Sequence, residues 1–146
     1  MRLDHAAIAA KIPHSGHMCL LHGVLEWDAT TIRCVARSHT AMDNPLRVAQ
    51  QLPVLCGIEY AAQAMAVHGA LSGLVGDKPR AGYLAGLRDI QWQRVRLDDV
   101  EEDLIIVAEQ IMGDASLAVY QFILSFNTDP VLQGRATVVL DAERAP

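Results

Sequence analysis

The chain has 146 residues, of which 51% are hydrophobic and 20% are charged, and its formal net charge is −5 at pH 7. This length fits one domain with a core of its own, and the hydrophobic content excludes a disordered chain. The negative net charge argues against nucleic acid as a partner.

The N-terminal sequence and the cysteines favour a cytoplasmic protein. The opening MRLDHAAIAAKIPH contains charged residues and histidines but no uninterrupted apolar stretch, so we expect no signal peptide. Cys19, Cys34 and Cys56 are odd in number, far apart and set in apolar runs. This pattern is typical of small buried residues in a reducing compartment rather than of disulfides.

The first third of the chain predicts a short helix followed by a hairpin. Asp4 is suited to be the N-cap of this helix, and Pro13 lies beyond its end. Residues 18–27 and 31–38 are apolar or β-branched segments joined by a short polar turn, which predicts two antiparallel strands. Residues 39–53 contain two prolines and have no clear period, so we expect an ordered loop.

One long helix and four strands are predicted for the remainder. Residues 54–73 are apolar almost all round, as expected of a helix inside a core. The strands are expected at residues 83–94, 104–112, 116–126 and 131–140. Consecutive strands with short connections form an antiparallel sheet, and the apolar helix must be wrapped by it. The order of elements therefore predicts an α+β hot dog fold, with residues 1–146 forming a single domain.

The apolar helix raises the question of a membrane span and of a carboxylate in its middle. Between residues 52 and 75 it carries Glu59, Gln63 and His68, which the centre of a bilayer penalises. We interpret it as a buried helix of a soluble protein, without a membrane span. Removing an ionised carboxylate from water costs several kcal/mol unless a partner compensates, so Glu59 needs a functional or structural reason.

Three stretches resemble the beta-hydroxyacyl-acyl carrier protein dehydratases. They are IPHSGHMCLLHGVLEW at 12–27, LPVLCGIEYAAQAM at 52–65 and GYLAGLRDIQWQRVRLDDV at 82–100. In the same superfamily, the runs DNPLR and IEYAAQAMAVHGAL are most similar to the divergent dehydratase-like proteins of aryl polyene gene clusters. The three stretches lie in the family's order, cover about 50 residues and anchor most of the chain.

The resemblance implies elimination of water from a 3-hydroxyacyl thioester to give the trans-2-enoyl thioester, in fatty acid or polyene-type biosynthesis. Glu59 would protonate the departing hydroxyl, for which burial would raise the pKa of its carboxyl. Gln63, one turn later, would orient Glu59 or bind the thioester. Backbone amides at Val54, Leu55 and Cys56 would polarise the thioester carbonyl. The alternative for Glu59 is a structural carboxylate paired with an arginine or tyrosine of the sheet.

The resemblance also implies a dimer, either of two copies or with another hot dog subunit, that has its active sites at the interface. The substrate would be carried on the phosphopantetheine of an acyl carrier protein or as a coenzyme A thioester. No metal or redox cofactor would be needed. His14, His17 and His22 with Cys19 match no standard zinc spacing, so we expect no metal site.

The catalytic base departs from the family's pattern. The family's histidine lies fourteen residues before the helix acid, and that position is Pro45 in this chain. His39 is the nearest histidine, and we predict that it serves as the base from a rearranged loop. Two other functions stay open: an inactive or weakly active hot dog subunit that supports an active partner, and an acyl thioesterase that uses Glu59 to direct water.

A cluster of basic residues lies in and beside the strand expected at residues 83–94. Only Asp89 opposes the positive charges between residues 78 and 96. The strip fits either a solvated strand edge or a docking site for the carrier protein or its phosphate. The candidate carrier-binding residues are Arg80, Arg88, Arg94 and Arg96.

Overall fold

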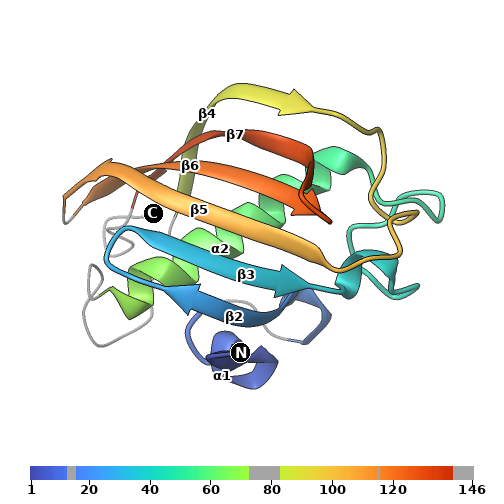
Figure 1. The fold of residues 1–146 in the computed structure, drawn as a ribbon, viewed down its shortest axis with the longest axis horizontal. Coiled ribbons are helices and arrows are strands. Elements are labelled where there is room, and N and C mark those ends of the chain that lie inside the picture. The colour runs from blue at the N-terminus through green and yellow to red at the C-terminus, as the bar shows by residue number, and fades with distance from the viewer. Residues whose placement is uncertain (13–15, 73–82, 115, 140–146) are drawn as a thin grey trace.

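In a computed structural model that describes residues 1–12, 16–72, 83–114 and 116–139, an antiparallel sheet wraps around one long helix (Figure 1). The strands are β1 (Leu3–Asp4), β2 (Leu21–Trp27), β3 (Thr31–Ala36), β4 (Tyr83–Trp92), β5 (Leu104–Gly113), β6 (Leu117–Phe126) and β7 (Asp129–Val139). The helices are α1 (His5–Ala9) and α2 (Gly57–Leu71), and the 3-10 turns are η1 (Gly16–Met18), η2 (Ser38–Thr40) and η3 (Val54–Cys56).

The predicted helices and hairpin are confirmed, with one change in the order of the sheet. Asp4 is the N-cap of α1, because its carboxylate accepts a hydrogen bond of 2.9 Å from the Ala7 N–H. The strands follow the order β1-β2-β3-β5-β6-β7-β4. Consecutive strands are therefore not neighbours throughout the sheet: β4 pairs with β7 at one edge, and β5 pairs with β3.

The core lies between the concave face of the sheet and α2. Along β6 the side chains of Ala118, Tyr120, Phe122 and Leu124 are buried, the alternation expected of a strand with one buried face. The helix begins close to the sheet at Gly57, where an added Cβ would lie 2.7 and 2.8 Å from leucine side chains of β7 and β6. The start of α2 is thus held at a short distance from the sheet.

The fold leaves one edge of the sheet incompletely covered. On β4 the large apolar side chains Leu84, Leu87 and Trp92 are 41%, 40% and 54% exposed. By length and composition alone, Val54–Leu71 could cross a membrane, but the sheet wraps this segment as it would the core helix of a soluble domain. A long exposed edge with apolar side chains is a surface that proteins normally cover.

Candidate active site

The start of α2 carries the predicted acid. Glu59 lies in the first turn of the helix, where the helix dipole favours a carboxylate. In this single chain Glu59 is half-buried, not buried as the sequence suggested. The buried positions of the helix include Gly57, Tyr60 and Gln63, and Glu59 is not among them.

The backbone N–H groups of Val54, Leu55 and Cys56, predicted to polarise the thioester carbonyl, differ in their hydrogen bonds. The Val54 N–H donates to the Val95 oxygen at 3.0 Å, and the Cys56 N–H donates to the Pro53 oxygen at 3.0 Å. These two amides are committed to the fold. For the Leu55 N–H the described residues show no backbone acceptor outside its own 3-10 turn. Leu55 is therefore the amide at this helix start that can meet a thioester oxygen.

Gln63 joins α2 to the segment that precedes β2. Its side-chain oxygen accepts a hydrogen bond of 2.8 Å from the Leu20 N–H, and its NH2 group donates to the Met18 oxygen at 2.6 Å. The side chain is 1% exposed. Gln63 thus positions the Met18–Leu20 backbone, and its predicted contact with the thioester stays a prediction.

His39 is buried in η2, where its imidazole has a fixed tautomer. Its Nε2 lies 3.0 Å from the carbonyl oxygens of Val100 and Glu102, which only accept hydrogen bonds, so Nε2 carries the proton. Burial lowers the pKa of His39, although the two carbonyl contacts act in the opposite direction. Nδ1 is buried without a hydrogen-bond partner among the described residues. The ring is thus neutral with a free lone pair, but it is only 1% exposed.

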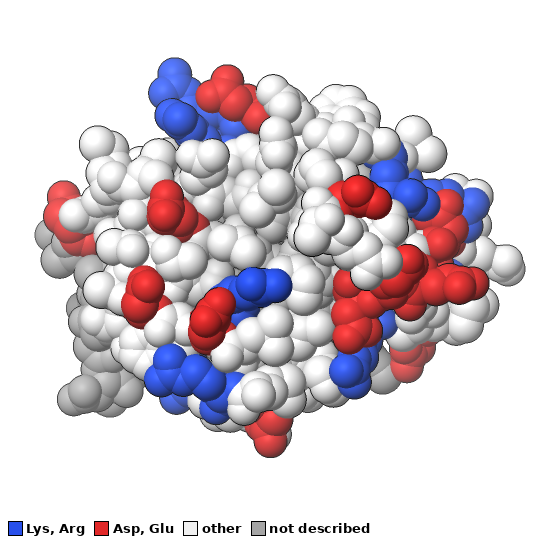
Figure 2. All heavy atoms as spheres, in the orientation of Figure 1, with Lys and Arg blue, Asp and Glu red and all other residues white. Residues whose placement is uncertain are grey.

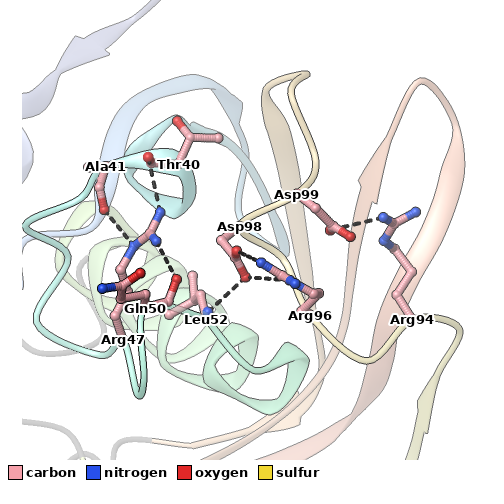
Figure 3. A network of polar contacts seen from close by, with 9 residues as sticks. All are labelled: Thr40, Ala41, Arg47, Gln50, Leu52, Arg94, Arg96, Asp98 and Asp99. Carbon is pink, nitrogen blue, oxygen red and sulfur yellow. Dashed lines mark hydrogen bonds and ion pairs between the residues drawn. The ribbon is translucent and has the colours of Figure 1, made fainter.

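The loop at the family's histidine position is held by other side chains (Figure 3). The Arg47 guanidinium donates to the carbonyls of Ala41 and Gln50, both at 2.8 Å, and to that of Thr40 at 3.1 Å. Asn44 donates to the Tyr60 hydroxyl at 3.0 Å. Two residues of this loop, Ala49 and Gln50, have positive φ. Arg47 and Asn44 therefore hold this loop, and neither role follows from the sequence pattern.

An open cavity lies beside this loop. It has a volume of about 330 Å³, and His5, Cys19, Ser38 and Asn44 are among its lining residues. The Ser38 hydroxyl donates to the Leu20 oxygen at 2.7 Å and contacts the Tyr60 hydroxyl at 2.8 Å. All the polar partners of Ser38 thus belong to the fold. Sequence reasoning missed this cavity because its walls come from segments far apart in the chain.

Two arginines of the predicted carrier-binding strip have carboxylate partners within the chain. Arg94 pairs with Asp99 at 3.0 Å, and the Arg96 Nε donates to Asp98 at 3.0 Å, so local carboxylates neutralise both. Figure 2 shows acidic side chains gathered at the end of the molecule where the loop between β4 and β5 lies. An acidic carrier protein would be repelled at this end.

Arg88 keeps its positive charge available and has a neighbour that the sequence did not predict. Arg88 of β4 lies directly opposite Arg135 of β7, and both are exposed. Neither forms an ion pair with another described residue. Like charges directly opposite one another destabilise a sheet. Arg80 lies outside the described residues.

Comparisons with known proteins agree with this architecture. The family model ApeP-like (ApeP dehydratase) matches residues 6–145. A chain of the dehydratase heterocomplex ApeI:P from Xenorhabdus doucetiae is 20% identical, with a TM-score of 0.81 over 90% of this chain and 89% of that one. No curated protein matches the chain.

Two further solved structures share the architecture with lower similarity. Zebra fish thioesterase superfamily member 2 is 17% identical, with a TM-score of 0.62 over 93% of this chain and 92% of that one. AziG from S. sahachiroi is 10% identical, with a TM-score of 0.61 over 84% of this chain and 91% of that one. At such identities these likenesses concern the fold alone, and they confirm the hot dog fold.

Proposed function

Because this chain belongs to the ApeP-like dehydratase family, we propose that it removes water from a 3-hydroxyacyl thioester, together with a second hot dog subunit. The observation that carries the proposal is the position of Glu59 in the first turn of α2, close in sequence to the available Leu55 amide. A helix acid beside a helix-start amide is suited to elimination next to a thioester carbonyl.

In the proposed reaction, the Leu55 N–H donates to the thioester oxygen and stabilises the charge that develops there. A base removes the proton from the carbon next to the carbonyl, and the electron pair of that C–H bond forms the new double bond. The C–O bond to the hydroxyl breaks, and the carboxyl of Glu59 supplies a proton to the departing oxygen. The products are water and the trans-2-enoyl thioester.

The second subunit supplies the base in this proposal. Pro45 occupies the position of the family's histidine, and His39 is buried with Nε2 committed to two backbone carbonyls. A solved structure that this chain resembles is described as a dehydratase heterocomplex, ApeI:P. His39 as the base is the second candidate, because its Nδ1 has no hydrogen-bond partner among the described residues. It would require movement of η2 to reach the substrate.

We place the acyl group on an acyl carrier protein that contacts Arg88 and Arg135. These two exposed guanidinium groups match the phosphate of phosphopantetheine and the carboxylates of an acidic carrier. A coenzyme A thioester carries the same phosphopantetheine chemistry and is the alternative. Such carriers place the reaction in the cytoplasm.

The proposal is tested with a 3-hydroxyacyl pantetheine thioester, given to the purified chain and to its complex with a co-expressed hot dog subunit. Formation of the enoyl thioester is expected from the complex. Glu59→Gln should lower the rate about 10²- to 10⁴-fold, because the amide cannot donate the proton, whereas Glu109→Gln on the exposed part of β5 should not. Release of free acid and thiol instead would identify a thioesterase and refute the proposal.

The same assay separates the two bases. If the partner supplies the base, His39→Ala leaves the rate of the complex within about twofold and the chain alone is inactive. If the chain alone is active and His39→Ala abolishes this activity, His39 is the base. His22→Ala is the matched control, since His22 is a half-exposed histidine on β2.

A further inference from the structure

The backbone that leads into α2 is bonded to the segment that follows β4. The Leu97 N–H donates to the Leu52 oxygen at 2.8 Å, and the Val54 N–H donates to the Val95 oxygen at 3.0 Å. Pro53 lies between these bonds, opposite Arg96. The last residues before the helix are thus held from one side by a short antiparallel bridge.

Asp98 completes this arrangement. Its carboxylate accepts a hydrogen bond of 2.8 Å from the Leu52 N–H, and Arg96 binds it through Nε at 3.0 Å and also through Nη2 (Figure 3). The Asp98 side chain is only 6% exposed, whereas that of Asp99 is 45% exposed. The arginine keeps the pKa of Asp98 well below its usual range. Asp98 is therefore a buried, ionised acceptor with a fixed direction.

We propose that Asp98 is a positioning residue for the dehydration, because it fixes the Leu52–Val54 backbone that aims the Leu55 N–H at the thioester oxygen. This inference rests on the proposed function of the helix start. Leu52 is bonded through both its N–H and its carbonyl, and Val54 through its N–H, so Leu55 follows directly from a fixed segment. Displacing an oxyanion donor by a fraction of an ångström weakens its contact with the transition state.

The kinetic test compares Asp98 with its neighbour in the intact complex. Asp98→Ala is expected to lower kcat about ten- to hundredfold while KM changes less than about twofold, because the amide matters most in the transition state. Asp98→Asn keeps an oxygen for the Leu52 N–H and should recover most of this loss. Asp99→Ala, in the exposed pair with Arg94, is the matched control and should leave kcat unchanged. Equal kcat values for the two alanine variants would overturn the proposal.

A second measurement does not depend on activity. In Asp98→Ala, hydrogen exchange at the backbone of residues 52–56 is expected to accelerate at least about tenfold, with the rest of α2 unchanged. Asp99→Ala should leave these rates as they are. If the unmodified complex makes no enoyl thioester but the exchange effect appears, the function fails while the positioning by Asp98 stands. If exchange is the same in both variants, Asp98 does not hold this segment.

Discussion

Replacing Tyr120 by phenylalanine tests a buried hydrogen bond that connects α2 to the middle of the sheet. The His68 Nε2–H donates to the Asp28 oxygen at 3.0 Å, so Nδ1 is the acceptor for the Tyr120 hydroxyl at 2.6 Å. His68 is 0% exposed and Tyr120 is 1% exposed. Without the hydroxyl, Nδ1 keeps its lone pair buried and unbonded. We expect Tyr120→Phe to lower the free energy of unfolding by about 1–3 kcal/mol.

Urea unfolding, followed by far-UV circular dichroism at a fixed protein concentration, measures this loss. A double-mutant cycle with His68→Leu isolates the bond, because the double variant has no unpaired nitrogen. The double variant should therefore cost less than the sum of the two single variants, by about 1 kcal/mol. A loss below about 0.5 kcal/mol in Tyr120→Phe, or simple additivity, would refute this account of the bond.

Three further outcomes are expected. The free energy of unfolding should fall as the pH drops below about 6.5, by at most about 1.4 kcal/mol per pH unit for each of His39 and His68. Burial lowers the pKa of both histidines, so the unfolded chain binds these protons first. Urea midpoints that are flat from pH 7 to 5 would contradict this. Gly57→Ala should cost about 1–3 kcal/mol, since its methyl would lie 2.7 and 2.8 Å from two leucine side chains, and an unchanged melting temperature would disagree. Arg47→Ala should accelerate hydrogen exchange in residues 40–51, whose carbonyls it binds, and unchanged protection there would exclude this role.

The sequence predicted those parts of the fold that depend on local patterns. Alternation along 116–126 and the apolar run of 54–73 are properties of single segments, and both elements are found. The position of β4 depends on which strand edge is free after the helix has packed. No local pattern contains that information, and β4 therefore pairs with β7, not with β5. The pair of residues in β1 is too short to produce a pattern.

In the candidate site, too, the sequence predicted the residue that a local pattern marks and missed the one that depends on a distant contact. Glu59 could be found because a carboxylate inside an apolar run is conspicuous in the sequence. Asp98 could not be found in this way, because its carboxylate accepts a hydrogen bond from the Leu52 N–H, which is 46 residues away in the chain. The acids that pair with Arg94 and Arg96 lie just after the basic run, so the charge pattern between residues 78 and 96 did not include them. A charge pattern in a sequence does not show which charged side chains form ion pairs.

The exposed edge of β4 and the half-buried acid lead to one last prediction. The segment that follows β4 is bonded to the start of α2 through the Val54 N–H and the Val95 oxygen, so a subunit that covers β4 also reaches the helix start. Leu87→Asp is expected to abolish both the complex and enoyl formation, because a charge would enter the covered face. Leu117→Asp, at 38% exposure against 40% for Leu87, is the control on β6. A complex that survives Leu87→Asp in native mass spectrometry would show that the partner binds elsewhere.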